Sequence, residues 1–127
     1  MGMVGLESAL RIVHATMVNT GRLDWRGVAR VMSETPARIG QATDAGQPLQ
    51  AGQLANVVLY DAETSSVFTE ADLAGKSVNS PYLGLELPGR VHTTIYRGLP
   101  TVRDGQVVDA EALRAARRSQ LATEGER

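Results

Sequence analysis

Apolar residues in the first third of the chain recur at helical spacing. The positions three or four residues apart are Leu6, Leu10, Val13 and Met17. This period predicts an amphipathic helix that ends at Asn19–Gly21. Glu7 falls in the first turn of the predicted helix, where a carboxylate interacts favourably with the helix dipole.

Two further helices are predicted before residue 47. Asp24 is expected to cap the first of them, with Leu23 and Val28 at the apolar positions that flank a helix start. Thr35 is expected to end that helix and to cap a short one that begins at Pro36. Each predicted helix is amphipathic and therefore needs an apolar surface to pack against.

The pattern after the turn-rich stretch 47–53 changes to strands. The run 54–60 is rich in β-forming residues and is expected to be a buried central strand that ends at Asp61. A short strand at 66–68 is predicted next, followed by a helical turn that Thr69 caps.

The last part of the chain is predicted to contain a hairpin and a helix. Residues 90–97 alternate as in a half-buried strand. Asp104-Gly105 lies between two short β-rich runs, a strong hairpin signature. Asp109 is expected to cap a final helix from 110 to about 120, with a frayed tail over 122–127. The fold class predicted is therefore α+β.

Composition and charge exclude several classes of function. The net charge of −1 provides no general attraction to nucleic acid or to anionic membranes. Cysteine is absent, which excludes disulfides and thiolate metal sites. The longest apolar run, 54–60, is too short to span a bilayer, and no signal peptide opens the chain, so we expect a cytoplasmic location.

The residues that carry chemistry form no recognisable catalytic pattern. His14 and His92 fall in different predicted regions, and neither has a second metal ligand at close spacing, so we interpret both as packing or surface residues. Lys76 is expected to be solvated. The acids have structural interpretations as caps, turns or strand ends: Asp24, Asp61, Asp104 and Asp109. We predict no catalytic residue and no metal ligand in this chain.

The hydroxyl residues and the arginines of the last helix also have plain interpretations. No histidine and acid are expected beside the candidate nucleophiles Ser77, Ser80 and Thr93. The arginines of the last helix are interpreted as a solvated basic face; they are Arg114, Arg117 and Arg118.

Several short motifs, taken in order, resemble the carboxy-terminal part of dihydroorotases, which are cyclic amidohydrolases. The motifs are Gly5-Leu6-Glu7, Ser33–Ala37, Gly52-x-x-Ala55–Asp61, Ser77–Pro81-Tyr82-x-Gly84, Leu87-x-Gly89-x-Val91 and Gly98-x-x-Thr101-Val102-x-Asp104-Gly105. The order is unbroken over 2–109. The first motif combined with the loop 79–84 resembles dihydroorotases in particular, whereas other motifs are shared by many cyclic amidohydrolases.

The resemblance implies a metal-dependent (β/α)₈ barrel with a small β-domain assembled from both chain ends. Residues 1–46 would be remnant helices of the barrel, 47–109 the small antiparallel β-sandwich-type domain, and 110–127 a carboxy-terminal helix and tail. The family hydrolyses or closes the cyclic amide of dihydroorotate in pyrimidine biosynthesis, using two zinc ions. Its metal ligands, among them a His-x-His pair, would precede residue 1. We therefore expect no cofactor in this chain and no activity from it alone.

One substrate contact is implied by the resemblance. In the family, the loop ahead of the Gly-Leu-Glu helix borders dihydroorotate, and Gly2 matches the glycine of that loop. Because a free chain end would not hold the loop in place, we expect Gly2 to be a vestigial contact.

Three interpretations remain open. The chain is a dihydroorotase-like segment, either truncated or one half of a split enzyme whose partner chain carries the barrel. Alternatively, it is a non-catalytic scaffold or oligomerisation module that associates through exposed helix stripes. The third interpretation, an independent enzyme with an unrecognised site, lacks a converging nucleophile, base or metal cluster.

Overall fold

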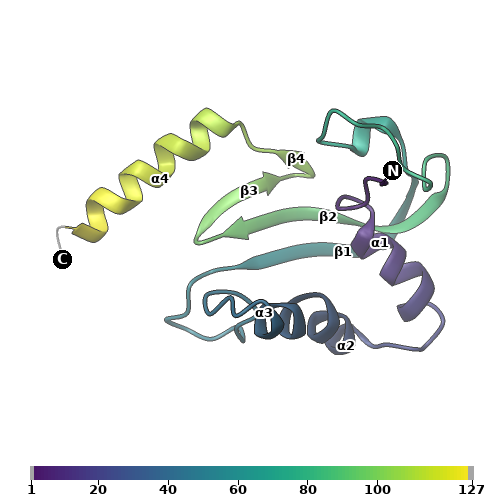
Figure 1. Cartoon of the computed structure of the whole chain (residues 1–127), viewed down its shortest axis with the longest axis horizontal. Coiled ribbons are helices and arrows are strands. Elements are labelled where there is room, and N and C mark those ends of the chain that lie inside the picture. The colour runs from purple at the N-terminus through teal and green to yellow at the C-terminus, as the bar shows by residue number, and fades with distance from the viewer. Residues whose placement is uncertain (1, 126–127) are drawn as a thin grey trace. The chain divides into compact units, whose positions relative to one another are not determined.

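The computed structural model describes residues 2–125 and shows an α+β chain (Figure 1). The strands form one four-stranded antiparallel sheet in the order β1-β2-β3-β4. Their bounds are Val57–Val67 for β1, Glu86–Tyr96 for β2, Leu99–Arg103 for β3 and Gln106–Val107 for β4. The chain divides into two compact units, Met1–Gly46 with Asp61–Arg90 and Gln47–Tyr60 with Val91–Arg127. The domain boundaries predicted at residues 46 and 109 separate barrel helices from a small β-domain and a last helix, and this assignment stays a prediction.

The helices of the first unit contain two π-helical segments. The elements are α1 (Ala9–Val13), the π-helical segment His14–Val18, α2 (Trp25–Ala29), the π-helical segment Arg30–Glu34 and α3 (Thr35–Ile39). In each π segment a backbone N–H bonds five residues back, from Asn19 to His14 and from Thr35 to Arg30. The first helix ends at Asn19 and the left-handed Gly21, as predicted.

The predicted cap of the second helix is confirmed, whereas the predicted break at Thr35 is wrong. The side chain of Asp24 accepts a hydrogen bond of 2.7 Å from the backbone N–H of Gly27. Thr35 has helical backbone angles and continues the helix instead of capping it. Pro36 lies in the first turn of α3, and the wider π-helical segment before it accommodates a residue that has no N–H to donate.

The first helix begins later than the apolar pattern predicts. The structure starts α1 at Ala9, so Leu6 and Glu7 precede the helix in a turn. Leu6 is 93% exposed and does not continue the half-buried stripe of Leu10 and Val13. The spacing of apolar side chains placed Leu6 in the predicted helix. This spacing does not show at which residue the helical backbone hydrogen bonds begin.

The prediction of a buried central strand at 54–60 is wrong in both respects. β1 starts at Val57 and continues past Asp61 to Val67. It stands at one edge of the sheet, and Val58 is 50% exposed. A continuous apolar run indicates β structure but does not decide which strand has neighbours on both sides.

This position changes the expected cost of truncating Val58. We expect Val58→Ala to lower the free energy of unfolding by less than about 1 kcal/mol, because half of the side chain already contacts solvent. Leu10→Ala, at a half-buried position of α1, should cost more, about 2 kcal/mol. Urea unfolding of both variants measures the difference. A larger loss for Val58→Ala would contradict the edge position.

The hairpin and the last helix follow the sequence closely. Asp104 and Gly105 both have positive φ, 52° and 75°, as a two-residue type I′ turn requires between β3 and β4. The helix α4 (Ala110–Gly125) is capped by Asp109, whose carboxylate accepts from the N–H groups of Glu111 and Ala112. The fraying predicted from 122 is wrong as far as residue 125, and residues 126–127 lie outside the described part.

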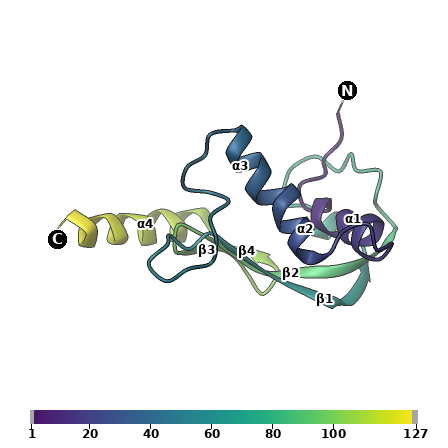
Figure 2. The same cartoon turned by 90° about the horizontal axis from the view of Figure 1, so that it is seen from below.

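The buried core lies in the first unit. Phe68 is 1% exposed, and Val28 and Leu87 are also buried. Thr69 and Asp72 form the predicted cap around a 3₁₀ turn, Glu70–Asp72. In Figures 1 and 2, α1 lies against the end of β1 and the start of β2. Over residues 2–125, no helix is long and apolar enough to cross a membrane.

Candidate functional site

The amino-terminal loop is held by Asn79 through two hydrogen bonds. The side-chain Nδ2 of Asn79 donates to the carbonyl oxygen of Gly2 at 2.5 Å. The carbonyl oxygen of Asn79 accepts from the N–H of Val4 at 2.9 Å. A free chain end was not expected to keep this loop in place, and the structure corrects that reason because residues 2–4 are tied to a segment more than seventy positions away.

The segment that carries Asn79 has hydrogen bonds of its own and is anchored to the core at Gly84. The N–H of Asn79 donates to Ser77 Oγ at 3.4 Å, and the N–H of Tyr82 donates to Ser80 Oγ at 3.4 Å. Gly84, with φ of 82°, donates its N–H to the carbonyl of the buried Phe68 at 2.9 Å. Ser77 and Ser80 therefore order the loop 77–84, which agrees with their interpretation as residues other than nucleophiles.

Glu7 forms a second tie to the same region. Its Oε1 accepts a hydrogen bond of 3.2 Å from the backbone N–H of Ala74. The dipole interaction predicted for Glu7 is wrong, because the residue precedes α1 and its carboxylate is turned towards the loop before Lys76. Lys76 is exposed, as expected.

The side chain of Arg11 joins α1 to the strands β1 and β2. Its Nη2 donates to the carbonyl of Ser66 at 2.7 Å, to Ser66 Oγ at 3.0 Å and to the carbonyl of Leu87 at 2.5 Å. Its Nε donates to the carbonyl of Pro88 at 3.4 Å. The guanidinium also lies 6.0 Å from the centre of the Phe68 ring. Arg11 is 7% exposed, so these bonds satisfy a buried charge and several backbone acceptors together.

The Asn79 tie can be tested by hydrogen exchange. Asn79→Ala removes the bond to the Gly2 carbonyl and should raise the exchange rate of the Val4 amide about fivefold, since one hydrogen bond contributes roughly 1 kcal/mol. Lys76→Ala, at an exposed position immediately before the loop 77–84, is the matched control and should leave the rate unchanged. Equal Val4 exchange in the Asn79 variant and the parent would show that the side chain does not hold the loop.

The two histidines lie in different units and both rings are engaged. His14 is buried, with its ring centre 4.9 Å from that of Trp25. The Nε2 of His92 lies 3.1 Å from Asp104 Oδ1 across the hairpin. His14 is a packing residue, and His92 is an exposed strand residue that faces a neighbour; both interpretations are confirmed. Among the side chains that the structure describes, residues 2–122, no group of three His, Asp or Glu could hold a metal ion.

A hydroxyl does stand beside a histidine and an acid. His92 Nδ1 lies 2.8 Å from Thr93 Oγ1 while its Nε2 faces Asp104. The prediction that Thr93 has no such neighbours is therefore wrong, because the hairpin turn brings Asp104 back over β2. The side chains of His92 and Asp104 are mostly exposed, so the three residues are interpreted as contacts that stabilise the hairpin.

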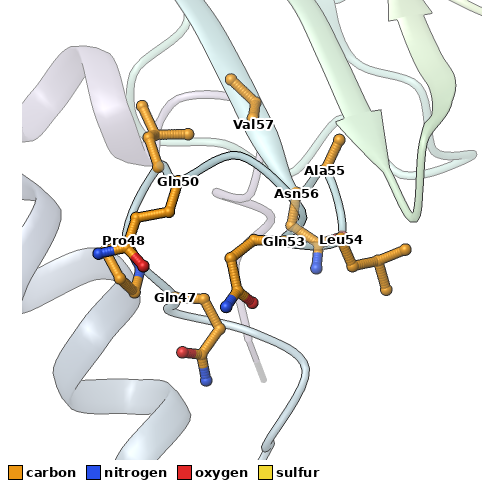
Figure 3. A pocket seen from close by; sticks show the side chains of 9 residues that line it. Gln47, Pro48, Gln50, Gln53, Leu54, Ala55, Asn56 and Val57 are labelled. Carbon is orange, nitrogen blue, oxygen red and sulfur yellow. The ribbon is translucent and has the colours of Figure 1, made fainter.

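A polar pocket of about 280 Å³ lies in the loop before β1 (Figure 3). Its amide side chains are Gln47, Gln50, Gln53 and Asn56. Asn56 Oδ1 already accepts from the N–H of Arg97 at 2.8 Å. The pocket offers neutral hydrogen-bonding groups and no acid, base or nucleophile among its lining residues, so it can bind a polar group but cannot perform acid–base chemistry.

The chain is similar in sequence to curated dihydroorotases. No protein-family model matches the chain. It is 51% identical over 109 residues to the dihydroorotase of Leifsonia xyli subsp. xyli, covering 86% of this chain and 25% of that protein. It is 54% identical over 107 residues to the dihydroorotase of Streptomyces coelicolor, covering 84% and 25%. The chain therefore spans about a quarter of the length of the curated relatives it matches.

Solved structures show the same arrangement of elements within larger enzymes. A D-hydantoinase structure matches with a TM-score of 0.75 and 28% identity, over 84% of this chain and 23% of the other. An L-hydantoinase (dihydropyrimidinase) from Arthrobacter aurescens matches with a TM-score of 0.71 and 29% identity, over 85% and 24%. The resemblance to dihydroorotases is confirmed as homology over one segment of those proteins.

Proposed function

We propose that this chain, homologous to dihydroorotases over about a quarter of their length, is a segment of a cyclic amidohydrolase and carries one loop of its substrate pocket, residues 2–5. Its role is to present the loop 2–5 at the rim of a substrate pocket, while the metal ions are held elsewhere in the enzyme. The observation that carries the proposal is the level of identity, about half of the residues over more than 80% of the chain.

The geometry of the loop supports this role. Asn79 holds the loop through two hydrogen bonds, and Gly2 and Met3 of the loop are exposed. A side chain added at Gly2 would meet nothing within 4 Å, so the described residues do not themselves require glycine there. A substrate that approaches the backbone closely would require it. Gly2 stays the only substrate contact that we propose.

Exposed apolar side chains in the helical region support packing against a further part of an enzyme. Leu6, in the turn before α1, is 93% exposed, and Ile39, the last residue of α3, is 75% exposed. We propose that α1–α3 correspond to terminal helices of a (β/α)₈ barrel and that the strands belong to its small β-domain. Burial of such side chains contributes about 1.5–3 kcal/mol each, a strong drive for association.

The residues present do not fit the zinc ions of the family. A zinc site needs three or four ligands about 2 Å from one point. His14 is packed against Trp25 in one unit, and His92 is paired with Asp104 in the other. We therefore derive no catalytic step through zinc on this chain.

Reconstitution tests the proposal. The chain, with zinc added, is mixed with the three quarters of Streptomyces coelicolor dihydroorotase that it does not match, and hydrolysis of dihydroorotate is followed. We expect no hydrolysis from either piece and measurable hydrolysis from the mixture. Asn79→Ala in this chain should lower kcat/KM of the mixture, whereas Arg103→Gln, at an exposed position of β3, should not.

Two results would contradict the proposal. Hydrolysis by the chain alone would show that it carries its own catalytic groups. An inactive mixture in which the two pieces demonstrably associate would show that the segment has lost the role. Its exposed apolar side chains would then favour the alternative, a scaffold or oligomerisation module, for which concentration-dependent self-association by light scattering is the measurement.

A further inference from the structure

A second pocket, of about 430 Å³, lies between α4 and the strands β2 and β3. All of its lining residues belong to the second compact unit, and α4 contacts β3 within that unit. The volume falls within the range of pockets that hold small molecules. The proposed function does not involve this pocket.

The floor of the pocket is apolar. Leu99 of β3 and Leu113 of α4 are both half-buried, and the ring of Tyr96 stands beside them. A small inorganic ion would leave this floor uncovered. A ligand that fits therefore needs an apolar body as well as a polar group.

The charged groups around this floor are all positive, and the other polar side-chain groups are the hydroxyls of Tyr96 and Thr101. The arginines that line the pocket are Arg97, Arg114, Arg117 and Arg118, and no acidic side chain lines it. Arg114 and Arg118 stand four residues apart on α4, so their charges repel at the same face of the helix. Neither forms an ion pair within the described part of the chain. An anion placed between them would be attracted by both.

Two of the arginines are held in position by one glutamine. Gln120 Oε1 accepts from Arg117 Nη1 at 3.1 Å, and Gln120 Nε2 donates to the carbonyl of Arg97 at 3.2 Å. Arg97 has a φ of 50°, and its N–H donates to Asn56 Oδ1 at 2.8 Å. Its guanidinium lies 5.7 Å from the centre of the Tyr96 ring. The Arg117 side chain and the backbone of Arg97 are therefore already ordered at one side of the pocket.

We propose that this pocket binds a small organic anion with a flat apolar body, of the class of aromatic carboxylates. The apolar ring covers Leu99 and Leu113, and the carboxylate meets Arg114 and Arg118. Guanidinium groups suit this ligand because they form paired hydrogen bonds with a carboxylate and also stack on flat rings.

Titration of the ¹⁵N-labelled chain with 1-naphthoate, followed by NMR, tests the proposal. A ligand of this size should bind with a Kd on the order of 1 mM, and the shifted resonances should include those of Leu99, Leu113 and Gln120. The double variant Arg114→Gln/Arg118→Gln should weaken binding at least tenfold. Both residues are exposed, so the variant should keep the fold. Arg26→Gln/Arg38→Gln, exposed positions of the other unit, is the matched control.

Two further probes separate charge from apolar contact. Neutral 1-naphthalenemethanol and inorganic phosphate should each bind at least tenfold more weakly than 1-naphthoate. Equal binding of the neutral compound would show that the arginines play no part, and equal binding of phosphate would show that the apolar floor plays none. Shifts centred on the exposed residues of β1, or binding unchanged by the double variant, would place the ligand elsewhere and overturn the proposal.

Discussion

Replacing Arg11 by Met should lower the free energy of unfolding by about 3 kcal/mol, because buried acceptors that lose their donor cost about 1–3 kcal/mol each. Methionine keeps much of the apolar stem but donates no hydrogen bond. The carbonyl groups of Ser66, Leu87 and Pro88 would lose a donor together. For a chain of this size, Tm should fall by roughly 10 °C. Thermal unfolding followed by circular dichroism measures the change.

The control for Arg11 is Arg38→Met, which removes an arginine at an exposed position of α3. It should change the free energy of unfolding by no more than about 0.5 kcal/mol, as is usual at surface positions. Similar small losses for both variants would show that water replaces the Arg11 bonds and that α1 is not held to the strands by them.

Replacing Phe68 by Ala should cost about 3–5 kcal/mol, the range observed for large aromatic side chains in cores. Phe68 is the largest fully buried side chain in the described part of the chain. Its backbone N–H donates to Leu85 at 2.8 Å and its carbonyl accepts from Gly84. Alanine preserves both bonds, so the loss reports on the side chain alone. Urea unfolding at equilibrium gives the difference.

Val67→Ala is the matched control for Phe68, because it truncates the preceding residue, whose side chain is half exposed. It should cost less than about 1 kcal/mol. A loss for Phe68→Ala that does not exceed this value would mean that the first unit has no packed core around the ring.

The parts of the fold that depend on neighbours in sequence could be predicted. Asp24 and Asp109 cap helices as expected, since a cap needs only the next three residues. Asp104-Gly105 forms the hairpin because both residues accept a positive φ. The continuation of the helix through Thr35 was missed, because the π-helical segment before it has no distinct sequence pattern.

The candidate site was predicted only in part. Gly2 and the 77–84 motif were both singled out from the order of motifs, but nothing in either segment showed that Asn79 and Gly2 bond to each other. Arg11 was counted as a polar position of an amphipathic helix, and the structure buries it against Ser66 and Leu87. A buried arginine has the same local pattern as an exposed one, because its partners are backbone carbonyls.

By itself the sequence determined the α+β class, the caps, the hairpin and the relation to dihydroorotases. Each of these depends on short-range periods or on the order of motifs along the chain. Only the tertiary structure decided that β1 is an edge strand, that Asn79 holds the loop at Gly2 and that Arg11 joins a helix to two strands. The physical reason is that the hydrogen bonds of Asn79 and Arg11 join positions some fifty to eighty residues apart. Only the folded chain brings these side-chain donors to their backbone acceptors.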